Sequence, residues 1–250
     1  YAKSQSVKFI HIPMIRRINP VYDIFSIYCL IKHIIKIRPH VIHSYTPKAG
    51  LICAISGFIM RVPYRLHTFT GLVFPTQPLL LSKILSNIDS LICRINTHII
   101  AEGMGVKKQL KDSYITNKKI HIIGNGNIAG IDTKYFNSNN FALKSNLKLV
   151  RENFLVNNYK FIFSYIGRIN KDKGIRELLQ AFTKLNNEKI LLIIVGDFEK
   201  RDRFSKLIKS SYLRSKNILW VSWQEDIRNY LKFSNCFVLP SYREGFPNIL

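Results

Sequence analysis

The stretch that decides the fold is residues 161–185, which read FIFSYIGRINKDKGIRELLQAFTKL. Residues 161–166 form a short run of apolar and aromatic side chains, which predicts a buried strand. A glycine-bounded turn, residues 167–174, comes next, and residues 175–185 then repeat apolar side chains at helical spacing. A strand, a turn and a helix in this order are typical of one βα unit in a parallel sheet.

Short apolar runs alternate with longer amphipathic stretches along the rest of the chain. Residues 124–127 and 137–140 are dense in turn-forming residues and indicate a domain crossing near residues 124–145. We therefore expect an α/β protein of two doubly wound domains, at residues 1–127 and 128–250. Further strands are expected at residues 7–12, 40–44, 64–68, 98–101, 120–123, 190–195, 218–221 and 236–239.

Composition excludes several classes of protein. Hydrophobic residues make up 47% of the 250 residues, which excludes a disordered or collagen-like chain. The four cysteines lie in apolar stretches without zinc-finger spacing, so we expect reduced thiols in the core. The longest uncharged apolar run, residues 51–60, is about half of the roughly 20 residues that a membrane span needs. We expect no transmembrane helix and a cytoplasmic protein.

The net charge of +23 makes anionic polymers and anionic lipid surfaces candidate partners. The 38 Lys and Arg residues are spread over both halves of the chain, however, and do not form a basic tail. A solvated basic surface is therefore the simpler explanation of the charge.

The turn at residues 167–174 carries the sharpest chemical signal. It links the carboxyl end of a strand to a helix N-terminus, where free N–H groups and the helix dipole favour phosphate. Arg168 and Lys173 add two positive charges there, which predicts a diphosphate-binding site. The alternative is a solvated basic turn in a chain rich in Lys and Arg.

A second candidate site follows the last expected strand, where residues 240–248 read PSYREGFPN. Glu244 precedes Gly245, and a proline stands just inside the expected helix start. Glu244 is a candidate acceptor of hydrogen bonds from sugar hydroxyls. Its alternative role is to complement the dipole of the following helix.

These two loops resemble the motifs of the retaining GT-B glycosyltransferases of family four, also called group 1. The motifs are GRxxxxKG, at residues 167–174, and PSxxEGxP, at residues 240–247. Residues 43–50, HSYTPKAG, and residues 65–71, RLHTFTG, are similar to segments of members that build bacterial surface polysaccharides. The resemblance runs from about residue 7 to residue 250, and both ends of the chain look incomplete.

The resemblance implies a GT-B fold, in which two Rossmann-like domains face a cleft, with the first domain incomplete and the second truncated. It implies that Glu244 contacts the donor sugar and that the imidazole of His67 faces the same sugar, so these are the expected catalytic residues. His43, also at a strand end, stays open between function and structure. The residues expected to bind the nucleotide diphosphate and line its pocket are Gly167, Arg168, Lys173, Gly174, Gly245, Phe246 and Asn248.

The implied reaction moves a sugar, with retention, from a nucleotide-diphosphate donor to a saccharide or lipid-linked saccharide acceptor in surface polysaccharide biosynthesis. The sequence contains no Asp-x-Asp motif and no acidic cluster, so we expect neither a metal nor another cofactor. No nucleic acid partner is expected. Two alternatives stay open: a non-catalytic binder of anionic polymers, and a nucleotide-sugar epimerase of the same architecture.

Some stretches have more than one interpretation. Residues 69–78 form a loop that would expose Phe69, Leu72, Val73 and Phe74 to an anionic membrane surface, with core packing as the alternative. Residues 20–38 have a thin polar stripe and are expected to form a buried helix. Glu102 is expected to cap the helix that begins after it. Trp223 follows a strand and either borders the nucleotide base or has a half-buried packing role.

Overall fold

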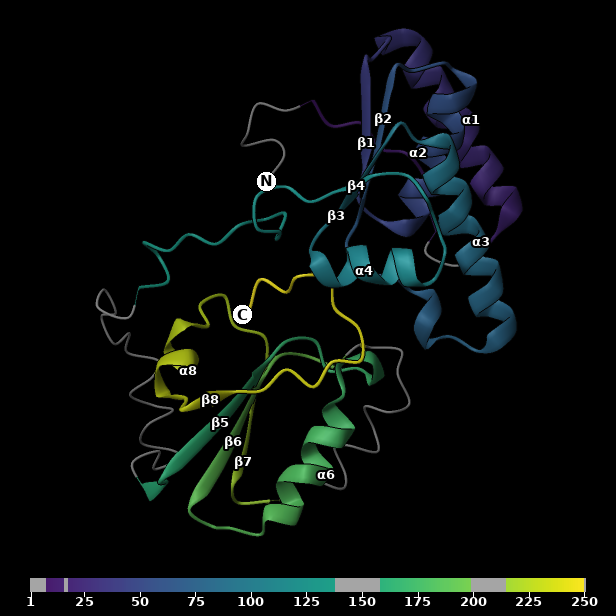
Figure 1. Cartoon of the computed structure of the whole chain (residues 1–250). Helices are drawn as coiled ribbons and strands as arrows, with labels where there is room; N and C mark the ends of the chain where they lie inside the picture. The colour runs from purple at the N-terminus through teal and green to yellow at the C-terminus, as the bar shows by residue number, and fades with distance from the viewer. Residues whose placement is uncertain (1–7, 16–17, 138–157, 199–214, 250) are drawn as a thin grey trace. The chain divides into compact units, whose positions relative to one another are not determined.

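The computed structural model describes residues 8–15, 18–137, 158–198 and 215–249, in which helices and parallel strands alternate (Figure 1). The chain forms two compact units. The first contains Tyr1–Ala129 and Glu244–Pro247, and the second contains Gly130–Arg243 and Asn248–Leu250. Each unit is built on a four-stranded parallel sheet, which confirms the predicted α/β class.

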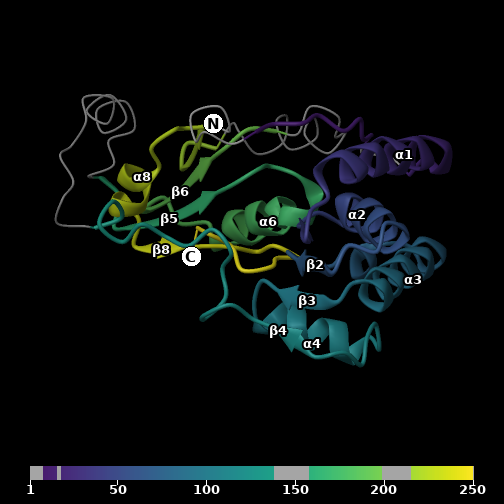
Figure 2. The same ribbon diagram turned by 90° about the horizontal axis from the view of Figure 1, so that it is seen from above.

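In the first unit, the strands lie in the order β1-β2-β3-β4 and every neighbouring pair is parallel. Helices α1, α2 and α3 lie side by side (Figure 2), and the buried residues Ile92, Ile99 and Leu110 belong to its core. The elements are α1 (Pro20–Ile37), β1 (Val41–Ser44), α2 (Pro47–Ile59), β2 (Tyr64–Phe69), the 3₁₀ turn η2 (Phe74–Thr76), α3 (Leu79–Ile95), β3 (His98–Ala101), α4 (Met104–Asp112) and β4 (Ile120–His121).

In the second unit, the strand order is β7-β6-β5-β8. Since β6 and β8 flank β5 on opposite sides, the carboxyl end of β5 is a topological switch point, the place where open α/β sheets bind ligands. The elements are β5 (Phe161–Ile166), the 3₁₀ turn η5 (Lys171–Lys173), α6 (Ile175–Leu185), β6 (Ile190–Val195), β7 (Ile218–Val221), α8 (Arg228–Phe233) and β8 (Cys236–Phe237).

Both faces of the second sheet are covered, as a doubly wound fold requires. Leu192 and Ile194 of β6 pack in one cluster with Leu179 of α6. Leu191 and Ile193, the alternate residues of the same strand, pack in another cluster with Tyr230 of α8. Figures 1 and 2 show α6 and α8 on opposite sides of this sheet. Burial on both faces explains why β6 is apolar along its whole length.

Apart from the first expected strand, the predicted strands agree with the structure to within two residues. The predicted strands at 98–101, 161–166, 190–195 and 218–221 and the helix at 175–185 are confirmed residue for residue. The strand expected at residues 7–12 is wrong for its described part, residues 8–12. These residues pair with no other strand, and the neighbouring Pro13 carbonyl instead lies 2.6 Å from the Ser26 hydroxyl of α1.

The expectation that residues 20–38 form a buried helix is wrong about the burial. Helix α1 forms there, but its buried residues are Ser26 and Ile34, whereas Val21 and Ile24 are 78% and 66% exposed. Of the polar stripe, Ser26 is buried, whereas Tyr22 and Lys36 at its two ends are exposed. Asp23 of this helix pairs with Lys48 of α2 at 2.7 Å, so the two helices are joined by polar contacts in addition to packing.

The expected exposure of the loop at residues 69–78 is also wrong. Phe69, Leu72 and Phe74 are all buried in the core of the first unit, so the core-packing alternative holds for them. Leu79 and Leu80, which begin α3, are the exposed apolar residues of this region. Among the described residues, no helix has the length and apolar character that crossing a membrane requires.

Candidate functional site

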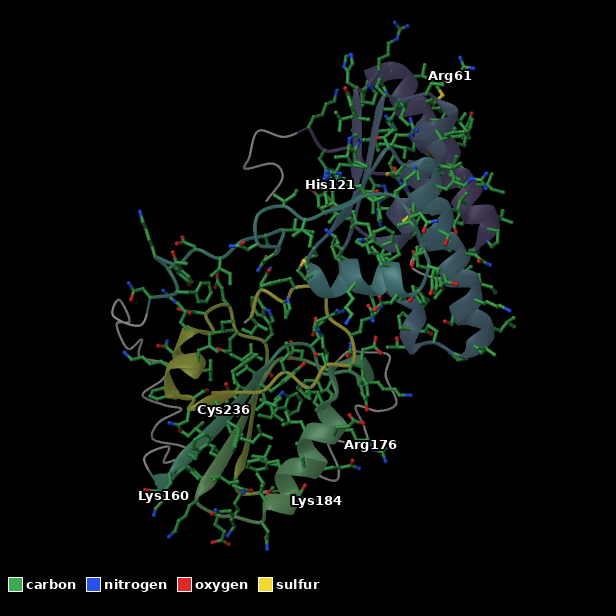
Figure 3. All side chains as sticks on the ribbon, viewed as in Figure 1. Arg61, His121, Lys160, Arg176, Lys184 and Cys236 are labelled. Carbon is green, nitrogen blue, oxygen red and sulfur yellow. The ribbon has the colours of Figure 1, made fainter. Side chains whose placement is uncertain are left out.

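At the carboxyl edge of the second sheet, the end of β7 contacts the turn after β6, and that turn contacts the turn after β5. The indole Nε1 of Trp220 in β7 donates to the carbonyl of Gly196, just after β6, at 2.8 Å. Gly196 in turn lies against the carbonyl of Gly167, just after β5, where a Cβ on residue 196 would collide with it. Figure 3 helps to orient the unit: Arg176 marks the end of α6 at this edge, and Lys184 and Lys160 mark the opposite edge.

Arg168 is held in place through its backbone. The hydroxyl of Tyr165, a fully buried residue of β5, donates a 2.8 Å hydrogen bond to the Arg168 carbonyl. The next residue, Ile169, is 2% exposed and its N–H donates to the Asp197 carbonyl at 3.0 Å. Because Ile169 points into the core, the guanidinium of Arg168 stands on the exposed side of a fixed turn.

Lys173 lies in a short turn that is stabilised by hydrogen bonds between its own residues. Its N–H is bonded by the side-chain oxygen of Asn170 at 3.2 Å, which caps the 3₁₀ turn η5. Gly174 follows with φ +65°, a left-handed conformation that favours glycine, and α6 begins at Ile175. The turn therefore delivers a lysine directly before a helix N-terminus, as a diphosphate site requires.

The loop after β8 packs on this turn. The N–H of Tyr242 donates to the backbone carbonyl of Asp172 at 3.0 Å, and Arg243 Nη2 lies 3.1 Å from Asp172 Oδ2. The Tyr242 hydroxyl is hydrogen-bonded to Glu177 in the first turn of α6, which raises the pKa of Tyr242. A Cβ at residue 174 would collide with the carbonyl of Pro240. The structure thus joins the two sequence motifs at the switch point, through Asp172, a residue that neither motif specifies.

The remaining residues of the second motif have contacts in the first unit, to which Glu244–Pro247 belong. A Cβ at Gly245 would lie 2.5 Å from the Thr70 carbonyl oxygen, so only glycine fits there. Burial raises the pKa of Glu102, while a hydrogen bond from the Phe246 N–H opposes that rise. This hydrogen bond is the contact that the structure shows for the Glu102 carboxylate, rather than the expected helix cap.

The expected site residues therefore fall into two groups. Arg168 and Lys173, with Gly167 and Gly174, lie on one turn of the second unit, and Asn248 is an exposed residue of the same unit. Glu244, Gly245 and Phe246 are counted with the first unit. That these residues act on one donor molecule stays a prediction.

His67 occupies a buried position on β2. It is 1% exposed, and its Nδ1 lies 2.9 Å from the hydroxyl of Ser44 on β1. Gly50 of α2 makes room for the ring, since a Cβ there would lie 2.5 Å from His67 Cε1. Burial, with the charge of His43 as a smaller cause, lowers the pKa of His67 to about 4, so the ring is neutral at pH 7. A catalytic role for this neutral imidazole stays a prediction.

His43 belongs to a polar cluster near the carboxyl edge of the first sheet. Its Nε2 lies 2.7 Å from the Thr68 hydroxyl, and its Nδ1 lies 3.1 Å from the Tyr45 hydroxyl. Burial lowers the pKa of His43 as well. The ring therefore contacts two hydroxyl groups, and a functional role for His43 stays a prediction.

Other candidate groups are Trp223, which follows β7, and the side chains that could bind a metal ion. Trp223 is 67% exposed beyond β7, so the interpretation of a half-buried packing role is wrong for this side chain, and its backbone N–H donates to the Asp197 carboxylate at 3.2 Å. Within the described ranges, no three His, Cys, Asp or Glu side chains form a group able to hold a metal ion. The cysteines in those ranges are all free thiols, and burial raises the pKa of Cys53 to about 11.

Comparisons with known proteins add an independent line of information. Residues 148–250 match the family described as Glycosyl transferases group 1. Over 95% of its length, the chain is 31% identical to the capsular polysaccharide biosynthesis glycosyltransferase CapM of Staphylococcus aureus, of which it covers 62%. It is 26% identical over 97% of its length to the UDP-Gal:alpha-D-GlcNAc-diphosphoundecaprenol alpha-1,3-galactosyltransferase of Escherichia coli, also covering 62%. The chain thus spans about three-fifths of the length of these curated relatives.

Solved structures share the fold. Alr3699/HepE of Anabaena, in complex with UDP, matches with a TM-score of 0.67 and 18% identity, over 90% of this chain and 59% of that chain. A glycosyltransferase of Rickettsia africae matches with a TM-score of 0.67 and 19% identity, over 96% of this chain and 61% of that chain. At such low identity, these matches establish the GT-B architecture.

Proposed function

Because the chain belongs to the group 1 glycosyltransferases, we propose that it transfers a sugar from a nucleotide-diphosphate donor to a saccharide or lipid-linked saccharide. The observation that carries this proposal is the junction of residues 167–174 with residues 240–243 at the switch point of the second sheet. A cationic turn at a helix N-terminus that meets the start of a loop with one carboxylate, Glu244, suits a diphosphate with a sugar attached.

In the proposed reaction, Arg168 and Lys173 hold the diphosphate and neutralise the charge that develops as it leaves. The Arg guanidinium offers a fork to two oxygens, and the Lys ammonium a mobile point charge. Glu244 accepts hydrogen bonds from the donor sugar, and the neutral imidazole of His67 helps to position it. The leaving phosphate takes the proton of the acceptor hydroxyl, so no side-chain nucleophile is needed and the configuration is retained.

The donor class we propose is a UDP-sugar. UDP is bound in the Anabaena structure, and the name of the Escherichia coli relative specifies UDP-Gal and a diphosphoundecaprenol acceptor. We extend both to this chain: a UDP-sugar donor, and a lipid-linked saccharide acceptor in surface polysaccharide biosynthesis. Such an acceptor agrees with reaction in the cytoplasm, with peripheral contact at the inner membrane face.

Metal-independent transfer is part of the proposal. Two fixed cations and a helix N-terminus meet the negative charge of the leaving group without a divalent ion. Adding EDTA to the assay below is expected to leave the rate of transfer unchanged. A rate that collapses with EDTA and returns with Mg²⁺ or Mn²⁺ would contradict this part.

The test incubates the full chain with a panel of nucleotide sugars and a membrane-lipid extract, and identifies the product by its mass. Transfer is expected, and Glu244→Ala is expected to abolish it without weakening non-specific binding of anions. Glu188→Ala is the matched control, because Glu188 is an exposed carboxylate before β6, at the opposite edge of the same sheet.

Two other outcomes would replace the proposal. Binding of anionic polymers that falls steeply with salt and ignores Glu244→Ala, without any transfer, would show a polyanion binder. Isomerisation of the nucleotide sugar without an acceptor would show an epimerase. Either result is distinguishable from transfer by the mass and identity of the product.

A further inference from the structure

Asp172 bonds to the loop after β8 in two ways. Its backbone carbonyl accepts the N–H of Tyr242 at 3.0 Å, and its carboxylate lies 3.1 Å from the guanidinium of Arg243. Consecutive residues of that loop are thus bound by a single residue of the turn after β5. The collision of a Cβ at Gly174 with the Pro240 carbonyl shows how closely the two backbones approach.

The two charged partners are each next to a proposed donor-binding residue. Asp172 directly precedes Lys173, and Arg243 directly precedes Glu244. One ion pair therefore links the backbone of the diphosphate-binding turn to the backbone that carries the sugar-binding carboxylate. Binding sites need their groups held to within about 0.5 Å, which a link of this kind supplies.

Folding stability does not explain the pair. The Asp172 side chain is 44% exposed and that of Arg243 is 27% exposed. Exposed ion pairs contribute little to folding stability, because solvent screens them and ordering two side chains costs entropy. The pair is therefore expected to matter more for the geometry of the two loops than for the stability of the unit.

An effect of net charge and a positioning role predict opposite changes in donor binding when the Asp172 carboxylate is removed. Asp172 is the one acidic residue in a turn that also carries Arg168, Lys171 and Lys173. If the turn acted only through its net charge, loss of the Asp172 carboxylate would make it more positive and would tighten the binding of a diphosphate. A positioning role predicts weaker binding, so the sign of the change separates the two explanations.

We infer that Asp172 is a positioning residue for the donor: its ion pair with Arg243 sets the distance between the diphosphate-binding turn and the sugar-binding loop. This inference rests on the proposed function, because it assigns the two loops to one donor. It assigns a role to a position within residues 167–174 that the motif leaves unspecified.

The test measures binding of UDP, UDP-glucose and UDP-galactose to the full chain by calorimetry. Asp172→Asn keeps the shape of the side chain and is expected to weaken binding of the UDP-sugar about threefold while changing UDP binding much less. Arg243→Gln is expected to do the same. The double variant should be no worse than either single variant, since both remove one interaction.

Two variants complete the design. The exchanged pair, Asp172→Arg with Arg243→Asp, restores the attraction and is expected to recover part of the lost affinity. Glu188→Gln, the same change of charge at the opposite edge of the sheet, is expected to bind like the wild type. Thermal unfolding of Asp172→Asn should stay within a few degrees of the wild type, because the pair is exposed.

The outcomes separate the inference from the function on which it rests. UDP-sugar binding by Asp172→Asn as tight as, or tighter than, that of the wild type overturns the positioning role while the proposed function stands. Additive losses in the double variant also overturn it, because they show that the two residues act separately. A wild type that binds neither UDP nor the UDP-sugars contradicts the proposed function, and the inference with it.

Discussion

The hydroxyl of Tyr165 donates a 2.8 Å hydrogen bond to the carbonyl of Arg168, three residues later in the chain. Tyr165 is fully buried, and its ring packs in the cluster between β5, β6 and α6. A rigid side chain of the core thus fixes the backbone from which the proposed phosphate-binding guanidinium projects. Gly167 lies between them, where a Cβ would come within 2.9 Å of the hydroxyl.

Tyr165→Phe tests this relationship. The variant keeps the packing of the ring but leaves the Arg168 carbonyl without its hydroxyl partner, so unfolding should cost about 1 kcal/mol less. Binding of UDP should weaken as well, because the turn is no longer fixed. Both tryptophans belong to the second unit, so urea unfolding followed by tryptophan fluorescence reports on this unit, and calorimetry reports on UDP. Unchanged stability and affinity would show that the hydrogen bond is dispensable.

Gly174→Ala is expected to separate the two loops. Residue 174 has φ +65°, which costs a residue with a Cβ about 1–2 kcal/mol, and the new methyl group would also collide with the Pro240 carbonyl. A loss of more than about 1 kcal/mol in the second unit is expected in the same fluorescence measurement.

Gly105→Ala is the matched control. Gly105 lies inside α4 with open space where a Cβ would be, so alanine should raise stability by about 0.5–1 kcal/mol through its helix propensity. Circular dichroism measures this change, because the first unit has no tryptophan. If Gly174→Ala is as harmless as the control, the close contact with the loop after β8 does not exist in solution.

Gly50→Ala tests the packing of His67. The new methyl group would lie 2.5 Å from Cε1 of an imidazole that is 1% exposed and bonded to Ser44. Overpacking of this kind costs about 1–3 kcal/mol, which exceeds the gain in helix propensity. The first unit should therefore lose stability in urea unfolding followed by circular dichroism. A gain like that of Gly105→Ala would show that the ring moves freely.

The sequence predicts the interior of the second sheet well, because β5 and β6 are buried on both faces and end at Gly167 and Gly196. Of the two edge strands, β7 matches its predicted bounds and β8 does not. The expected strand at residues 236–239 is shorter, Cys236–Phe237, since only β5 pairs with it. At an edge, the length of a strand depends on its single partner, and the chain's own pattern does not contain that information.

The residues of the candidate site could also be predicted only in part from the sequence. Arg168 and Lys173 could be predicted from their place between a strand and a helix. The role of Asp172 could not, because its partner Arg243 is 71 residues away and the pair exists only when β8 lies beside β5. His67 was predicted at a strand end, yet its burial depends on Gly50 of α2, which no local pattern reveals.

Two buried groups of the first unit make its stability depend on pH in opposite directions. Burial lowers the pKa of His67 from 6.5 to about 4, so between these values the unfolded chain holds more protons and stability rises with pH. Burial raises the pKa of Asp89 from 3.8 to about 7, so between these values the folded chain holds more protons and stability falls with rising pH. In the wild type, the two dependences oppose each other between about pH 4 and 6.5.

Asp89→Asn removes the dependence that comes from Asp89, so comparison with the wild type measures it. The free energy of unfolding of the variant, minus that of the wild type, is expected to increase from pH 5 to pH 7, by at most about 1.4 kcal/mol per pH unit, and to level off above. The reason is that the wild type increasingly pays the cost of a buried carboxylate, which asparagine never carries. Urea unfolding followed by circular dichroism at pH 5, 6, 7 and 8 measures the difference, with the exposed Glu188→Gln as control. A difference that stays constant over this range would show that Asp89 ionises freely in the folded protein.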